Sequence, residues 1–330
     1  MAFLAVANRI HEFDTVVAAL DSTLANSFDP QFVPGSITFP SSSASITKNF
    51  PTGTTNWTWV RFNLARVGTS TSIGSSANAI EIRDGANNLL ASMFRTASGS
   101  GALTLRAHGT TNVDAGTFTF STTVPSTNFV SIKIEQIGIG MVVEFWTGSL
   151  LPSLQLRAVV PDRGARGAPR SVFINASRFS FGDSLNCYVS EFAVADHSLL
   201  GSRVIAQVPT SAGAYSEMTG LLADLNDSSD VTGIITDAAG ERMTWGHPAY
   251  AGPARTLDAL VAVFKGHRDA GTPARLASML RTGGVDYFAP NVVIDNPTWV
   301  MQQWPVNPAT GLKWTTAELA GLQAGLRSAA

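Results

Sequence analysis

Hydrophobic and polar side chains alternate along most of the chain from residue 28 onward. In the clearest segment, residues 57–66, Val60, Phe62 and Leu64 fall on one face of an extended backbone, and aromatic or polar side chains fall on the other. Further segments with strand-like patterns follow at 78–83, 89–95, 102–108, 117–124, 129–136, 141–147, 154–160, 171–179 and 185–195. About ten strands separated by turn residues, without helices between them, predict an all-β sandwich or barrel.

The first residues follow a different period. Five apolar positions step by three and four residues, which predicts one apolar stripe along a helix: Ile10, Phe13, Val17, Leu20 and Leu24. Two heptads are marginal in water, so the stripe needs a partner surface. Either it docks on its own domain, or it anchors the protein to copies of itself or to another chain. We interpret residues 1–26 as a helical or extended anchor for oligomerisation, and we expect its removal to leave a folded protein that no longer assembles.

The last strand of the first series breaks its own alternation. Cys187 and Val189 share one face, whereas Phe192 and Val194 share the other, and a regular strand cannot bury both pairs on the same side. A β-bulge near Ser190-Glu191 would bring the two pairs together. Alternatively, both faces are covered, one by the opposing sheet and the other by a second domain.

Residues 206–230 are rich in turn signals and predict a linker or docking segment. Strand patterns then return at 233–237, 241–245, 257–265, 275–281, 285–288, 299–304 and 322–326. Thr315 and Glu318 have the spacing of a capping box, which opens a helical turn. These elements predict a second sandwich of immunoglobulin (Ig) size, roughly 100 residues, over residues 231–330.

Only 14% of the 330 residues are charged, against about 25% in typical soluble domains. Ser, Thr, Asn and Gly supply the polar surface instead, which suits strands and turns and also suits a protein packed into a larger assembly. The net charge of −2 gives no excess of positive charge of the kind that indicates nucleic-acid binding. No apolar run approaches the roughly 20 residues that span a bilayer, and the first residues lack a signal-peptide pattern. We expect a soluble protein made in a cytoplasm, with no nucleic-acid or membrane partner.

Four residues project from the face of the 57–66 strand opposite Val60: Trp57, Trp59, Arg61 and Asn63. If that face is open, the indole rings can stack on sugar rings while the polar side chains hydrogen-bond to them. This makes the four residues a candidate glycan- or partner-binding site. The alternative is that the aromatic side chains belong to a core or an interface, since their large buried area alone explains them.

Four arginines surround a Gly- and Pro-rich loop at 161–170: Arg157, Arg163, Arg166 and Arg170. Guanidinium groups pair readily with carboxylates, so one hypothesis is an arm that grips an acidic partner or an anionic glycan. The alternative is a solvated, mobile loop.

No catalytic or metal constellation emerges from the sequence. His197, which follows Asp196, has the chemistry of a general base, but no pattern places a nucleophile beside it. Glycosidases use two carboxyl groups about 5–10 Å apart, whereas Glu81 and Asp84 face opposite sides of their strand, and we find no carboxylate pair. The single cysteine, Cys187, excludes a disulfide framework and predicts a buried, inert thiol. We therefore expect no enzyme activity, no metal and no cofactor.

Two stretches resemble a known family. The first is Ser190-Glu191-Phe192-Ala193-Val194-Ala195-Asp196, followed by Gly201-Ser202-Arg203-Val204. It resembles the closing strand of concanavalin A-like (laminin-G-like) jelly rolls in virion proteins of tailed bacteriophages. The second is Asn-Pro-Ala-Thr-Gly-Leu-Lys-Trp-Thr at 307–315, followed by Glu318-Leu319 and Leu322-Gln323-Ala324-Gly325, which resembles the C-terminal end of the same proteins. The resemblance covers roughly residues 28–330, and its motifs are structural, so no active site is carried over.

The resemblance implies a jelly roll at residues 27–205 and an Ig-like β-sandwich at 231–330, in a fibre, tail, neck or head-decoration protein of a phage particle. The leading hypothesis is a non-enzymatic structural protein of the virion, made in the host cytoplasm. It would form homo-oligomers, as trimers, with other virion proteins as partners, and its jelly roll would present a face to a host glycan or a protein. A carbohydrate-binding adhesin module is the second hypothesis, and a polysaccharide-degrading enzyme is the third.

Overall fold

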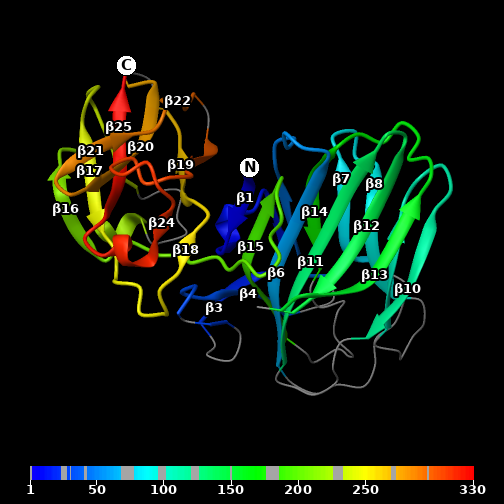
Figure 1. The fold of residues 1–330 in the computed structure, drawn as a ribbon. Helices are drawn as coiled ribbons and strands as arrows, with labels where there is room; N and C mark the ends of the chain where they lie inside the picture. The colour runs from blue at the N-terminus through cyan, green and yellow to red at the C-terminus, as the bar shows by residue number, and fades with distance from the viewer. Residues whose placement is uncertain are drawn as a thin grey trace. The chain divides into compact units, whose positions relative to one another are not determined.

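The chain forms two compact units in the computed structural model, Met1–Ala206 and Gln207–Ala330. The structure describes residues 2–23, 28–29, 31–40, 43–67, 78–95, 102–119, 126–148, 151–175, 186–225, 233–268, 273–295 and 297–330. Strands dominate both units, and each described strand pairs within its own unit (Figure 1). The predicted all-β fold class, a jelly-roll sandwich followed by a smaller β-sandwich, is confirmed.

The first unit is a jelly roll of two antiparallel sheets. One sheet has the order β13 (Ser153–Val160), β12 (Gly140–Thr147), β11 (Ser126–Ile137), β6 (Trp57–Val67), β15 (Asn186–Ala195), β4 (Ser36–Phe39) and β3 (Leu20–Ser22), and β1 (Phe3–Ala7) also pairs with β15. The other has the order β10 (Val113–Thr119), β9 (Ala102–Ala107), β8 (Leu89–Arg95), β7 (Asn78–Asp84), β14 (Pro169–Ile174), β5 (Ser45–Asn49) and β2 (Thr15–Val17). We call them the β6 sheet and the β7 sheet, and Figure 1 shows them as two facing layers.

The hydrophobic core lies between these two sheets. Val60, Phe62 and Leu64 of β6 are at most 1% exposed and contribute to the same core cluster as Ile80 and Ile82 of β7. Full burial of a side chain of this size stabilises a fold by roughly 1.5–3 kcal/mol. The alternation along β6 therefore determines which of its faces is turned inward.

A β-bulge in β15 resolves the broken alternation of that strand. The register against β6 shifts between Ser190 and Ala193, and Glu191 adopts a left-handed backbone with a φ of 53°. The two apolar pairs on either side of the bulge consequently all reach the same core, and the buried Cys187 is one of these residues. The bulge also divides one edge of β15, because β4 pairs before it and β1 pairs after it.

The N-terminal segment is extended rather than helical. It forms β1, a single 3₁₀ turn at Ile10–Glu12, β2 and β3, and its strands pair with β15, β5 and β4. The β-branched residues of Thr15–Val17 favour an extended backbone, and the edges of both sheets offer hydrogen bonds that an isolated two-heptad helix lacks. The segment thus docks on its own domain, which is the first of the two alternatives.

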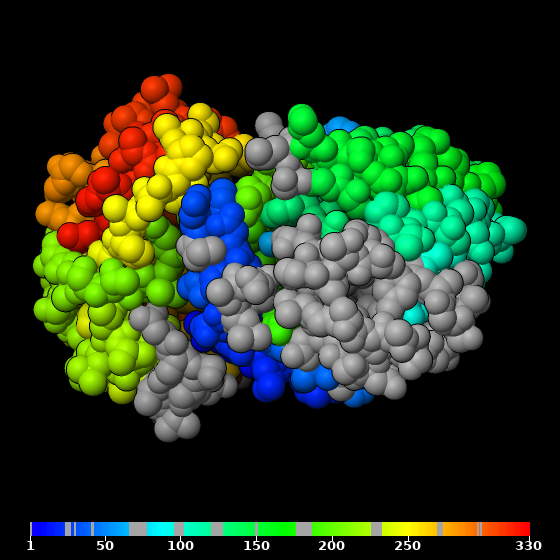
Figure 2. All heavy atoms as spheres, turned by 90° about the horizontal axis from the view of Figure 1, so that it is seen from below, coloured from blue at the N-terminus to red at the C-terminus, as the bar shows by residue number. Residues whose placement is uncertain are grey.

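The residues of the predicted apolar stripe consequently separate. Phe13 is buried in the core, with its ring 5.3 Å from that of Phe192, and Ile10 packs beside the core. Val17 and Leu20 are 45% and 57% exposed, and N-terminal residues (blue) form part of the surface in Figure 2. Leu24 lies outside the described residues.

The second unit is the smaller sandwich. Its main sheet has the order β16 (Ser211–Ser216), β17 (Arg242–Gly246), β25 (Gln323–Ala329), β20 (Arg275–Thr282) and β21 (Val285–Phe288), and β22 (Val292–Val293) also pairs with β20. Two further pairs are β19 (Leu260–Gly266) with β23 (Thr298–Trp304) and β18 (Thr256–Leu257) with β24 (Trp314–Thr315). Leu280 of the main sheet packs in one cluster with Trp304 and Trp314 of these pairs. The second layer is therefore made of separate strand pairs.

Two local expectations in this unit can be compared with the structure. Thr315 and Glu318 form the predicted capping box at the start of a 3₁₀ turn, η4 (Thr316–Leu319). For the 206–230 segment the docking alternative applies, since η3 (Leu222–Leu225) packs on the core of the unit, and β16 in addition is a strand of the main sheet. Residues 226–230 lie outside the described ranges.

Candidate binding site

The candidate site predicted on β6 is largely buried. Trp59, Arg61 and Asn63 are at most 4% exposed, whereas Trp57 keeps 37% of its surface accessible. Residues 197–204, which follow β15, cover the outer face of this half of the β6 sheet. Trp59 packs there in a cluster with Leu199 and so belongs to a core. The three buried residues cannot form an open glycan platform, and the core interpretation applies to them.

An ion pair at the bulge holds this covering segment. Arg203 Nε lies 2.7 Å from Glu191 Oε2 and Arg203 Nη2 lies 2.8 Å from Glu191 Oε1, while the guanidinium stacks 3.5 Å above the Phe32 ring. Burial raises the pKa of the Glu191 carboxyl, an effect that Arg203 opposes without cancelling. The bidentate geometry is nevertheless that of an ion pair. Arg61 Nε adds a hydrogen bond to the Ser202 carbonyl at 2.8 Å.

The other half of the same face carries an ionic and aromatic cluster. We call it the Lys133 patch, and its members are Trp57, Lys133, Glu135, Glu144, Trp146 and Arg157. Lys133 Nζ lies 2.6 Å from Glu135 Oε2, 3.8 Å from Glu144 Oε2 and 5.2 Å from the centre of the Trp57 ring. On Glu144, Trp146 Nε1 donates to Oε2 at 3.3 Å and Arg157 Nε lies 3.4 Å from Oε1. Charged and aromatic groups from four strands thus share one surface.

Strand register brings the patch together. Lys133 on β11 lies opposite Glu144 on β12, and Glu144 lies opposite Arg157 on β13. Directly opposed residues of antiparallel strands share a face, with Cβ atoms about 5 Å apart. The tight turn at Gly138-Ile139, where Ile137 pairs with Gly140, sets this register. No pattern within a single strand marks these carboxylates, because they lie on different strands; counting outward from Gly138 puts Glu135 and Glu144 on one face.

The arrangement holds charged groups in fixed positions beside an aromatic ring. Glu135 and Glu144 both point at the Lys133 ammonium, so their oxygens are fixed hydrogen-bond acceptors with a paired charge. The side chains of Lys133, Glu135 and Glu144 keep 12–23% of their surface accessible, beside the more open Trp57 ring. A ligand with an apolar ring face and several hydroxyls matches this combination of indole, ammonium and carboxylates.

The four arginines around the 161–170 loop are engaged within the first unit. Three of them donate through Nε or Nη1 to backbone carbonyls, Arg163 to Gly138, Arg166 to Leu89 and Arg170 to Phe50, at 2.8–3.0 Å. Arg157, which is half exposed, belongs to the Lys133 patch. The structure does not bring the four guanidinium groups together in one binding site. These hydrogen bonds tie the loop to neighbouring strands, and contact of its arginines with an acidic partner stays a prediction.

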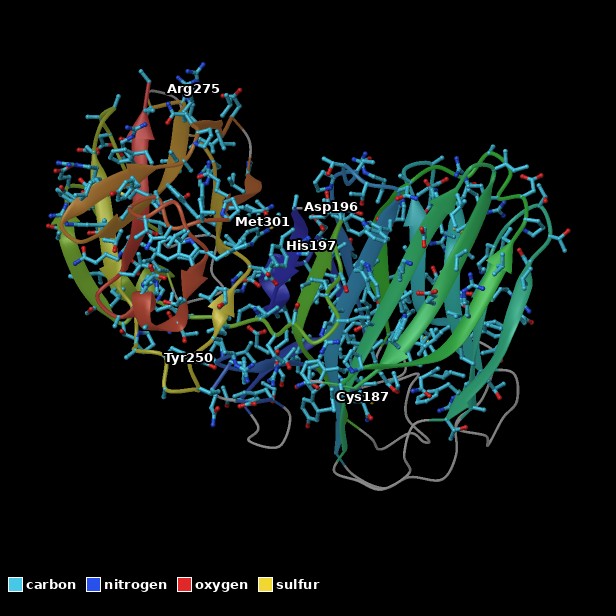
Figure 3. All side chains as sticks on the ribbon, viewed as in Figure 1. Cys187, Asp196, His197, Tyr250, Arg275 and Met301 are labelled. Atoms are coloured by element: carbon cyan, nitrogen blue, oxygen red, sulfur yellow. The ribbon has the colours of Figure 1, made fainter. Side chains whose placement is uncertain are left out.

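Asp196 and His197 adjoin the end of β15 (Figure 3), and His197 Nδ1 lies 3.6 Å from Asp196 Oδ1, beyond hydrogen-bond distance. Asp196 is fully buried and accepts hydrogen bonds from Ala2 N at 2.5 Å and from Thr54 Oγ1 at 2.6 Å. Burial acts to raise the pKa of Asp196, but these hydrogen bonds outweigh it and lower the pKa to about 2. His197 packs edge-on against Phe3, with ring centres 4.9 Å apart. Asp196 therefore secures the N-terminal strand rather than orienting a base.

A serine–histidine pair lies on the β7 sheet. Ser92 Oγ and His108 Nε2 are 2.9 Å apart, and the two residues are only 2% and 9% exposed. Burial, together with Arg106 and Arg166, lowers the pKa of His108 to about 4. A histidine that stays neutral to this pH is a weak base, and the buried hydroxyl is shielded from substrates. The pair acts as a structural hydrogen bond.

We also looked among the described residues for groups that could hold a metal ion and for helices that could span a membrane. Across the ranges that the structure describes, no group of three or more His, Cys, Asp or Glu side chains is arranged to hold a metal ion. None of the described helices has the length and apolar character needed to cross a membrane.

No family model matches the chain, and no curated protein matches its sequence. Solved structures that share its β-sandwich include a GH131 β-glucanase catalytic domain from Podospora anserina, at 13% identity over 60% of this chain and 87% of that chain, with a TM-score of 0.36. The CBM2 module of the evolved Dit of Lactobacillus casei BL23 phage J-1 matches at 11% identity over 47% and 71%, with a TM-score of 0.31. Lectin I-B4 from Griffonia simplicifolia matches at 8% identity over 55% and 93%, with a TM-score of 0.34. These likenesses concern the fold alone.

Proposed function

We propose that this chain is a non-enzymatic attachment protein that binds a surface glycan through the Lys133 patch. The observation that carries the proposal is the accessible Trp57 indole beside Lys133, Glu135 and Glu144, all held on strands of one sheet. Rigid strands keep such groups in place without an ordering cost on binding. The indole offers a surface for a sugar ring, and the charged groups offer partners for its hydroxyls.

The absence of enzyme activity is part of the proposal. Both carboxylates of the Lys133 patch are paired with the same ammonium group, whereas glycoside hydrolysis uses two carboxyl groups that flank the scissile bond. His108 and His197 each lack the setting of a general base. Release of reducing sugars from a polysaccharide by the purified protein would contradict this part.

We further propose that the protein is a homo-oligomeric component of a tailed-phage particle, such as a fibre, tail, neck or head-decoration protein. The sequence resemblance supports this role, and the residues that carry it have structural tasks here. Glu191 and Arg203 hold the covering segment of the first unit. Asn307 Nδ2 donates to Glu318 Oε1 at 2.7 Å in the second unit. Absence of the protein from purified particles by mass spectrometry would contradict this assignment.

The glycan site is tested on an array of bacterial surface polysaccharides. We expect Trp57→Ala to weaken binding by up to about tenfold, because a stacked ring contributes roughly 0.5–1.5 kcal/mol beyond the area that it buries. Trp57→Phe should retain most of the binding, and Lys133→Met should weaken it. Arg83→Ala, on the β7 sheet, is the control and should bind as the wild type does.

Thermal unfolding of each variant accompanies the array, because Trp57 Nε1 also donates to the Asp196 carbonyl at 2.9 Å. A wild-type protein that binds no glycan, or a folded Trp57→Ala variant with unchanged binding, would overturn the proposed site.

A further inference from the structure

The main sheet of the second unit has one apolar and one arginine-rich face. Leu280, Ala324 and Leu326 point into the cores of the unit. From the opposite face project the side chains that we call the arginine face: Arg242, Arg275, Arg281 and Arg327, with Tyr215 and Phe288 between them. They come from β16, β17, β25, β20 and β21. Four guanidiniums on one sheet face are notable in a chain with few charges.

One half of the arginine face is neutralised internally. Arg242 Nη2 lies 2.8 Å from Glu217 Oε1, and its guanidinium stacks 3.8 Å above the Tyr215 ring. Arg281 Nη1 and Tyr215 Oη both hydrogen-bond to Asp286, at 2.5 and 2.6 Å. These contacts leave little positive charge for a ligand in this half.

The other half carries two guanidiniums without a carboxylate. Arg327 lies 4.1 Å above the Phe288 ring, and its Nη2 donates to Asn291 Oδ1 at 3.1 Å. Arg275 is exposed at the outer end of β20 (Figure 3). Among the described residues, neither forms an ion pair. Strand register places the two as diagonal neighbours on β20 and β25, with Cβ atoms about 7 Å apart.

The geometry selects the chemistry of a ligand. Arg327 lies over one face of the Phe288 ring, its Nε is buried and its Nη2 is bonded to Asn291, so its guanidinium can meet a ligand only through the Nη edge, near the exposed Arg275. Guanidinium donors pair with carboxylates. Nucleic acid is disfavoured, since two arginines are few against the six to ten phosphate contacts of a strong binder. Carboxylates spaced along a polymer fit better.

We infer that Arg275 and Arg327 bind the carboxylate groups of an acidic polysaccharide. The inference uses the proposed glycan-binding function only for the class of ligand, because the arginine face shares no residue with the Lys133 patch. It gives the second unit a contact of its own with a surface polymer, and two contacts on one chain raise avidity through effective concentration.

The test measures binding of the full chain to alginate, a polymer of uronic acids, with uncharged dextran, polyglutamate and polyphosphate as comparison probes. We expect the wild type to prefer alginate and to lose binding as salt is raised. Arg275→Gln/Arg327→Gln should weaken alginate binding about tenfold or more. Arg275→Lys/Arg327→Lys should retain part of it.

Arg83→Gln/Arg106→Gln in the first unit removes the same charge and is the matched control, which should bind alginate within about twofold of the wild type. Unchanged alginate binding by a folded Arg275→Gln/Arg327→Gln variant would overturn the inference, and so would tighter binding of polyglutamate or polyphosphate than of alginate. Trp57→Ala in the same assay separates the sites. Loss of alginate binding in the arginine variant alone supports this inference even if the Lys133 patch fails its own test.

Discussion

Arg61 is a buried cation of the first unit, and burial and its neighbours together determine how it titrates. Burial lowers the pKa of Arg61 to about 10, although Glu191 acts to raise it. Arg61 therefore stays charged at neutral pH, with Nη1 donating to Ser131 Oγ at 2.7 Å. A buried group left without such a partner costs roughly 1–3 kcal/mol, so substitutions at the partners destabilise the fold.

His108 makes the first unit sensitive to acid. Its pKa is about 4 in the folded protein, against an ordinary value of 6.5, so the unfolded chain takes up the proton first. Its stabilising contribution is complete above pH 6.5 and is lost as the pH falls from there towards 4. The free energy of unfolding of the wild type should fall between pH 7.5 and 4.5. We expect this fall to be smaller in His108→Gln, by on the order of 2 kcal/mol, as measured by urea denaturation.

The exposed Thr117 provides the control. Thr117→Gln removes no titratable group and should keep the pH dependence of the wild type. If His108→Gln keeps it as well, the burial of His108 does not have the stated effect.

Among the elements, the bulge in β15 and the segment after it are joined by one ion pair. The bulge turns the Glu191 side chain away from the core. The segment after β15 brings Arg203 back to pair with this carboxylate. We expect Arg203→Ala to destabilise the first unit by roughly 3–5 kcal/mol, because it leaves a buried carboxylate without its cation. Chemical denaturation followed by tryptophan fluorescence measures the change.

The double variant Glu191→Gln/Arg203→Met removes both charges and should be more stable than Arg203→Ala alone. Arg157→Ala breaks a half-exposed pair and should change stability by about 1 kcal/mol or less. Equal stability of Arg203→Ala and Arg157→Ala would contradict this account of the bulge.

At the scale of the whole molecule, the two units have separate cores and no shared sheet among the described strands. We expect a fragment of residues 207–330 to fold cooperatively by itself, since a unit of roughly 100 residues can bury enough surface for stability. Trp245, Trp304 and Trp314 are buried, so their fluorescence should shift to longer wavelength on unfolding.

A shorter fragment, residues 231–330, tests the role of β16. It lacks this edge strand and the buried Met218, and it should be clearly less stable than 207–330. If both fragments are equally stable, the 206–230 segment is a linker after all.

Patterns along the chain predict many of the strands, although not those of the first 50 residues or β16. Side-chain alternation is a local property of an extended backbone, so it puts Val60, Phe62 and Leu64 on one face, which the structure shows to be the core face. The mismatch between Val189 and Phe192 allows either a bulge near Ser190-Glu191 or two covered faces, and the register shift in β15 shows the bulge. The capping box at Thr315 and Glu318 is local in the same sense.

Only the tertiary structure decided which faces are open and which distant residues meet. Alternation gives Trp57 and Trp59 the same orientation, and only the return of residues 197–204 buries one and leaves the other accessible. Heptad spacing from Ile10 to Leu20 was overruled by sheet edges far along the chain. Glu135 and Glu144 share a cation because two strands align across a turn. The periodicity of a segment indicates which secondary structure it forms. Burial and charge pairing depend instead on contacts with other segments, and the sequence pattern of one segment carries no information on those contacts.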